Sequence, residues 1–321
     1  MKALLLKVPE HTVLLTSSPT HLILSAEEGS VLGQIPVESQ QLFIPLARPG
    51  IFATMGYDKK FRLWLCDPKG SKAPLQLLYS CSFPKKLTHG TACELEHKEY
   101  CFIADKFGDV YIIDVDKAMA SANLEDKMIR QDFMVPVTGL TDLPVCKFIM
   151  GHQEVITQIL ISPKKDFIVT IDKASKIKVS HVPHFHNIHA IYFGHHAEIV
   201  YASFLSPYEL LTLDQKNTLI LWDITQEDAA MKMEAKLPVL SAANSFLVID
   251  GDSVAIGFQE NVVTVLEIKR ETKSLLEKCR AKVEGVKEIC AAFKTEEGKI
   301  GIKMVAIDDK TQASSIMTII I

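Results

Sequence analysis

The stretch FGHHAEIVYASFLSPYELLTLDQKNTLILWDI, residues 193–224, decides the expected fold. It consists of short apolar and β-branched runs that are separated by Ser206-Pro207 and by Asn217-Thr218. Runs of this length, bounded by turn signals, predict short antiparallel strands and not helices. A Gly-His pair stands near the beginning of the stretch, at 194–195, and a Trp-Asp pair near its end, at 222–223.

The preceding segment, residues 150–182, repeats this pattern. Gly151-His152 and Ser162-Pro163 correspond to the two earlier pairs, and Ile177 aligns with Leu219 at a spacing of 42 residues. Strand groups that recur every 40–45 residues or so are typical of propeller blades. Both segments resemble WD repeats, although Ser180 falls where the later segment has Trp222.

Weaker copies of the repeat extend over the chain. The seven positions that align with Leu219 are Val31, Phe61, Val110, Ile177, Leu219, Val263 and Ile316. Three of the copies carry an aspartate five residues before this position, namely Asp105, Asp172 and Asp214. The predicted fold is therefore all-β, a seven-bladed WD40-type β-propeller formed as a single domain by residues 1–321. In such a ring each blade covers its neighbours, and long exposed sheet edges disappear.

Two segments need separate predictions. The apolar run Ala3 to Val8 is expected to supply the outer strand of the last blade. Residues 116–148 separate two repeats by more than a normal loop, and we interpret them as an inserted loop with one helical turn. Loops longer than about 15 residues are often functional or disordered.

Composition narrows the class of protein. The chain has a net charge of −4, so contact with nucleic acid would require a local basic patch. Its seven cysteines are scattered without a C-x-x-C pair, which favours free thiols in a reducing compartment. No apolar stretch reaches the roughly 18 residues of a membrane helix. We therefore expect a soluble intracellular protein that does not enter a membrane.

No catalytic or cofactor-binding motif is recognisable. The chain lacks G-x-S-x-G, H-E-x-x-H, P-loop and G-x-G-x-x-G patterns, so neither catalytic residues nor a cofactor are predicted. Four histidines lie close together, at 181, 184, 186 and 189, but they do not form a closed ligand set. We predict no metal there, and a metal-dependent propeller enzyme is the alternative that rests on this cluster alone. His152 and His195 are expected in buried hydrogen-bond networks within their blades.

Lysines are concentrated between residues 164 and 178. Lys176 and Lys178 flank Ile177 in a predicted strand, so both are expected to point away from the face of Ile177. This arrangement predicts a fixed pair of positive charges that could contact carboxylates or phosphates. The alternative is that these lysines only keep the turns soluble.

Three segments together resemble one family. ADKFGDVY (104–111), TIDKASKIKVSHVP (170–183) and FGHHAEIV (193–200) are similar to the WD-repeat non-catalytic subunit of tRNA (guanine-N7-)-methyltransferase. The resemblance implies a heterodimer in which this chain binds and stabilises the catalytic subunit. It also implies that tRNA is reached through the complex, where a variable-loop guanine is methylated from S-adenosylmethionine. A generic WD-repeat scaffold in another assembly is the alternative.

The resemblance also implies which residues contact the partner. Lys178 matches the basic residue of the family pattern I-[KR]-[VI]-S, Lys106 the lysine of A-D-K, and Asp172 and Lys173 the opening of the second motif. Lys176 occupies the variable position before Ile177. The family's acidic pair is replaced here by Ala174-Ser175. The resemblance implies a nuclear location, but the basic C-terminal tail of some members is missing, so a cytoplasmic location stays open.

Overall fold

The computed structural model describes most of the chain. Residues outside the description are 1, 9–10, 27–29, 40, 69–72, 121–126, 129–144, 150–151, 186, 229, 238–240, 284–285, 295–298, 308–313 and 321. The chain divides into two compact units, one formed by residues 1–173 and 177–189 and the other by residues 174–176 and 190–321. A single domain over residues 1–321 stays a prediction.

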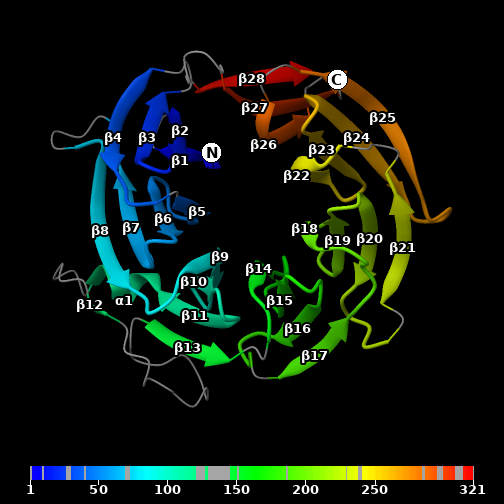
Figure 1. Cartoon of the computed structure of the whole chain (residues 1–321), viewed down its shortest axis with the longest axis horizontal. Coiled ribbons are helices and arrows are strands. Elements are labelled where there is room, and N and C mark those ends of the chain that lie inside the picture. The colour runs from blue at the N-terminus through cyan, green and yellow to red at the C-terminus, as the bar shows by residue number, and fades with distance from the viewer. Residues whose placement is uncertain are drawn as a thin grey trace. The chain divides into compact units, whose positions relative to one another are not determined.

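The first unit is built from antiparallel sheets of consecutive strands (Figure 1). The first sheet has the order β1 (Lys2–Val8), β2 (His11–Ser17), β3 (His21–Ala26), β4 (Val31–Pro36). The second contains β5 (Gln41–Pro45), β6 (Ile51–Gly56), β7 (Lys60–Cys66) and β8 (Leu75–Ser82). The third contains β9 (Leu87–Leu95), β10 (Lys98–Asp105), β11 (Asp109–Asp114) and β13 (Val145–Ile149).

A fourth sheet lies at the boundary between the units, which falls within its last strand. It consists of β14 (Ile156–Ile161), β15 (Phe167–Asp172), β16 (Ile177–His181) and β17 (Ile188–Tyr192). The second unit continues with β18 (Ile199–Phe204), β19 (Glu209–Asp214), β20 (Thr218–Asp223) and β21 (Met231–Lys236). Next come β22 (Ala243–Asp250), β23 (Ser253–Phe258), β24 (Val262–Lys269) and β25 (Ser274–Lys282). The last sheet contains β26 (Val286–Lys294), β27 (Ile300–Ile307) and β28 (Ser314–Ile320).

The described residues thus form seven successive sheets, and the chain has the predicted all-β WD40 propeller fold. Burial follows strand position within a sheet. The second strands β15 and β23 are buried along their whole length, whereas the outer strand β25 is mostly exposed. A strand covered on both faces must be apolar throughout, which explains runs such as FIVTI, because alternation appears only where one face meets water.

The N-terminal strand is the first correction. β1 was expected in the last blade, but it pairs with β2 in the first sheet, from Lys2↔Ser17 to Val8↔His11. Only two residues separate the strands, so the hairpin closes with a small loss of chain entropy. Leu6 and Val8 pack into the same cluster as Val13 and Leu15. The third strand of this sheet is therefore β3, and Val31 begins the outer strand instead of marking a third strand.

The other six aligned positions lie in the third strand of their sheets, which shows that they are equivalent. The segment 116–148 agrees with its prediction only in part. The predicted helical turn is present as α1 (Val115–Ala120), but Val145–Ile149 is β13, which pairs with β11. A two-residue strand, β12 (Lys127–Met128), pairs in parallel with the outer strand β8. Residues 121–126 and 129–144 lie outside the described residues.

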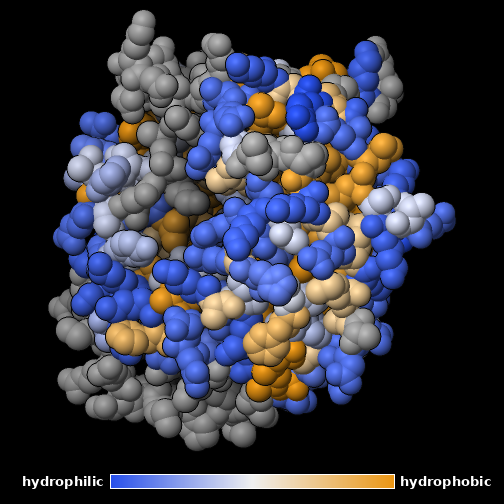
Figure 2. Space-filling model, turned by 45° about the vertical axis from the view of Figure 1, so that its right-hand side comes forward, coloured by the Kyte–Doolittle hydropathy of each residue, from blue (hydrophilic) through white to orange (hydrophobic). Residues whose placement is uncertain are grey.

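Figure 2 shows one face of the molecule. Most of the face in Figure 2 is hydrophilic, and apolar side chains gather there in a few separate groups. None of the described helices is sufficiently long and apolar to span a bilayer.

Candidate functional site

A hydrogen-bond network links the segment before β18 with the strands β19 and β20. His195 Nδ1 lies 3.1 Å from Asp214 Oδ2 and its Nε2 lies 2.7 Å from Thr212 Oγ1. Thr212 Oγ1 also lies 2.8 Å from Trp222 Nε1, from which it accepts a hydrogen bond. Burial lowers the pKa of His195, although the hydrogen bond with Asp214 opposes this change. The ring is therefore neutral near pH 7, with the proton on Nδ1, because a carboxylate can only accept.

The sheet β14–β17 contains the same network without its tryptophan. His152 Nδ1 lies 2.9 Å from Asp172 Oδ2, and its Nε2 lies 2.7 Å from Thr170 Oγ1. Ser180 replaces the tryptophan, and its buried hydroxyl has no hydrogen-bond partner among the described residues. Asp172 is fully buried in this network. The structure thus gives Asp172 an internal role that the resemblance did not indicate, and its contact with a partner stays a prediction.

The predicted lysines differ in accessibility. Lys106 and Lys173 are exposed and Lys176 is half-buried. Lys178 is only 5% exposed, because it lies in β16 opposite Thr170 of the buried strand β15. The expected pair of exposed charges at Lys176 and Lys178 is therefore wrong. Contact of these four lysines with a partner protein stays a prediction.

The replacement of the family's acidic pair has a local explanation in the second unit. Ser175 adopts a φ of 63° and is buried. Its hydroxyl donates to the carbonyl of Ala197 at 2.6 Å and accepts from the amide of Ile199 at 3.2 Å. A carboxylate could not donate to Ala197, so this turn requires the hydroxyl of Ser175.

The histidine cluster forms an aromatic group. The rings of His181 and His189 each lie 5.1 Å from the ring of Phe167 and 5.3 Å from one another. His184 is exposed, and His186 lies outside the described residues. In the part of the chain that the structure describes, no three His, Cys, Asp or Glu side chains are placed to hold a metal ion.

A basic and aromatic cluster, consisting of Lys85, Lys86, Lys106, Tyr57 and Phe107, lies on the first unit. Lys85 Nζ is 3.8 Å and Lys106 Nζ 5.0 Å from the centre of the Phe107 ring, and Lys86 Nζ is 5.1 Å from that of Tyr57. The two rings are 55% and 61% exposed. Of the five residues, sequence reasoning identified only Lys106. The available signals were an aromatic residue in the turn DKFG and the pair Lys85-Lys86 just before a strand.

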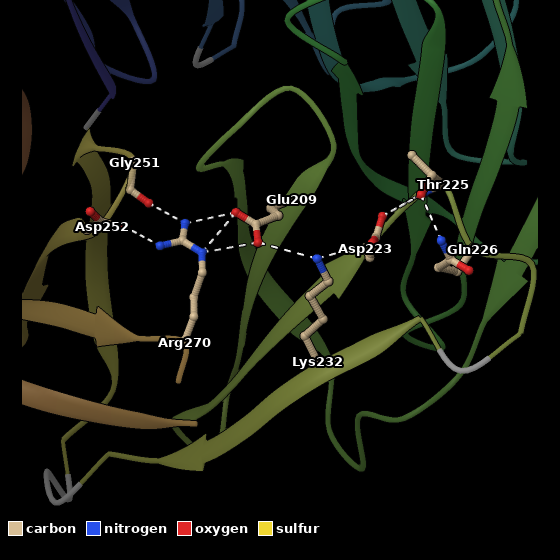
Figure 3. A network of polar contacts seen from close by, with 8 residues as sticks. All are labelled: Glu209, Asp223, Thr225, Gln226, Lys232, Gly251, Asp252 and Arg270. Atoms are coloured by element: carbon tan, nitrogen blue, oxygen red, sulfur yellow. Dashed lines mark hydrogen bonds and ion pairs between the residues drawn. The ribbon is translucent and has the colours of Figure 1, made fainter. Parts of the chain in front are cut away.

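An ion-pair network crosses from the sheet β18–β21 to the sheet β22–β25 within the second unit (Figure 3). Arg270 donates from Nε and Nη2 to Glu209 and from Nη1 to Asp252. Lys232 continues the network, 3.5 Å from Glu209 and 3.1 Å from Asp223. The hydrogen bonds from Arg270 lower the pKa of Glu209. Charges of alternating sign thus connect two blades.

Replacing Arg270 with alanine is expected to lower the free energy of unfolding by about 1 kcal/mol at pH 7, since the pair is bidentate but partly exposed. Glu209 has its lowered pKa only in the folded state. Its contribution is therefore complete above its unfolded pKa, about 4.3, and is lost as the pH falls through the folded value. Urea unfolding should show a larger difference from wild type at pH 7 than at pH 3. Lys273→Ala, an exposed neighbour, is the control, and an equal loss there would contradict the role of the network.

Comparison with known proteins gives one consistent group of relatives. No protein-family model matches the chain. A tRNA (guanine-N(7)-)-methyltransferase non-catalytic subunit of Anopheles gambiae is 35% identical over 31% of this chain and 26% of its own length. The Saccharomyces cerevisiae subunit of that name is 28% identical over 60% of this chain and 39% of its own length. The Aedes aegypti subunit is 24% identical over 70% of this chain and 51% of its own length. The chain thus spans between a quarter and a half of these curated relatives, and it resembles them at modest identity.

Solved structures agree on the fold. The WD40 repeats of RRP9 match with a TM-score of 0.68 at 13% identity, over 98% of this chain and 92% of that one. U3-55K matches with a TM-score of 0.69 at 12% identity, over 98% and 94%. At such identities these matches support the WD40 fold and carry no functional information.

Proposed function

We propose that this chain is a non-catalytic accessory subunit that binds and stabilises the catalytic subunit of a tRNA (guanine-N7-)-methyltransferase. The observation that carries the proposal is the naming of the curated relatives as non-catalytic subunits of this enzyme. The pairs His152–Asp172 and His195–Asp214 support it, because each is engaged in a hydrogen bond inside its own blade.

In this proposal the two chains form a heterodimer, and tRNA is bound by the complex. The accessory chain needs no cofactor, because S-adenosylmethionine belongs to the catalytic subunit. The partner contacts proposed are Lys106 and Lys173, which are exposed, together with Lys176 and Lys178. Contact through Asp172 would require a change in its buried network. A nuclear location is part of the proposal and can be tested by imaging the tagged chain.

Reconstitution tests the proposal. The catalytic subunit of the same organism is purified with and without this chain, and N7-methylguanosine formation is measured on a tRNA transcript. We expect the chains to copurify and activity to depend on this chain. If they neither copurify nor change methylation, the proposal fails and a scaffold in another assembly becomes the leading explanation. Metal analysis of the purified chain separately tests the alternative of a metal-dependent enzyme.

A further inference from the structure

The three lysines of the basic and aromatic cluster are not neutralised by the protein. None of Lys85, Lys86 and Lys106 forms an ion pair with a described residue. Two aspartates in the adjoining segments have other partners. Asp58 forms an ion pair with Arg62 of β7 at 2.8 Å, and the buried Asp105 accepts a hydrogen bond from the amide of Phe107 at 2.8 Å. Three ammonium groups therefore share a small exposed area without a carboxylate partner.

The cluster is held in place by its backbone. Three loops, which follow β6, β8 and β10, supply its residues, and two hydrogen bonds join them. The amide of Phe83 donates to the carbonyl of Lys59 at 2.7 Å, and the amide of Lys106 donates to that of Lys86 at 3.0 Å. Gly108 completes the turn at a φ of 80°, and a Cβ there would lie 2.9 Å from the carbonyl of Glu154. The loops therefore present the lysines from a defined platform.

The chemistry of the cluster suits a chain of phosphates. Each ring attracts ammonium groups to its face, which holds flexible lysine side chains near one another. Because Lys85 and Lys106 both lie near the Phe107 ring, this ring is a support for ammonium groups and not a free stacking surface. Lysine is a common phosphate ligand that acts as a point charge. It is depleted at protein–protein interfaces, so a group of three lysines favours a phosphate partner over a protein partner. A phosphate backbone can neutralise several lysines at once.

We propose that Lys85, Lys86 and Lys106 bind the phosphate backbone of RNA. The identification of that RNA as tRNA rests on the proposed function. The chain as a whole is acidic, so binding by this patch alone is weak and adds to the binding by a catalytic partner. Lys106 was predicted to contact the catalytic subunit, and the experiment below separates the two roles.

The test uses a triple variant, Lys85→Glu, Lys86→Glu and Lys106→Glu, with a matched control of equal charge change, Lys98→Glu, Lys216→Glu and Lys273→Glu. The three control lysines are exposed; Lys98 begins β10, and Lys216 and Lys273 lie in turns that do not contribute to the cluster. Binding of a labelled tRNA transcript is measured by fluorescence anisotropy, for the chain alone and for the reconstituted complex, between 50 and 200 mM salt. Affinity between the two proteins is measured in parallel, and thermal melting verifies that both variants fold.

We expect the cluster variant to bind tRNA at least about 10-fold more weakly than the control, with a salt dependence reduced by about two released counterions. Phe107→Ala should weaken binding only about two- to threefold, since the ring supports lysines and does not stack on bases. Unchanged tRNA binding overturns the inference. A loss of affinity for the catalytic subunit, with normal tRNA binding, also overturns it and makes the cluster a protein interface. If wild type does not bind the catalytic subunit, the proposed function fails, while RNA binding by the chain alone still decides the inference.

Discussion

Replacing Asp214 with alanine is expected to lower the free energy of unfolding by about 3–5 kcal/mol. The carboxylate accepts from His195 and from the amides of Lys216 and Thr218, at 3.1, 2.9 and 2.8 Å. Its removal would leave three donors without an acceptor, and each buried donor left unsatisfied costs about 1–3 kcal/mol. The loss should spread through Thr212 to Trp222, which belongs to the same network.

Urea unfolding followed by tryptophan fluorescence measures this effect. Asp228→Ala removes an exposed carboxylate from the same unit and should change stability by less than about 0.5 kcal/mol. If Asp214→Ala is as stable as Asp228→Ala, the network does not stabilise the blade.

Replacing Lys178 with glutamate is expected to destabilise the chain itself by about 3–5 kcal/mol, because a carboxylate would replace an ammonium at a position only 5% exposed. The exposed strand position expected from sequence would have tolerated this change. Chemical unfolding measures the loss, with Lys173→Glu, at an exposed position in the preceding turn, as the control. Equal stability of the two variants would contradict the burial of Lys178.

The partner role of Lys178 therefore needs a different variant. Lys178→Met keeps the aliphatic part of the side chain and removes only the charge. If the ammonium forms a desolvated pair with the catalytic subunit, association should weaken by about 2–5 kcal/mol. Calorimetry of the two purified proteins measures this, after unfolding has shown that the variant is folded. Wild-type affinity in a folded Lys178→Met chain would remove this residue from the interface.

Local patterns in the sequence were sufficient to predict the repeat and the hydrogen-bond networks inside its blades. His195 lies just before β18, and Thr212, Asp214 and Trp222 lie in β19 and β20 of the same sheet, so their spacing along the chain reflects their proximity in space. The same spacing places His152 beside Asp172. Six of the seven aligned positions are structurally equivalent for this reason, since strand length and turn chemistry are encoded within each repeat.

Tertiary structure alone decided the features that join distant segments. The pairing of β1 with β2 competes with a pairing in the last blade, and apolar alternation is compatible with both. Lys178 is buried because neighbouring strands cover it, which its own hydrophilic character does not reveal. The basic and aromatic cluster unites Tyr57, Lys85 and Phe107 through loops of different strands. Periodicity carries no information about such loops, because their proximity arises only when the sheets that bear them pack together.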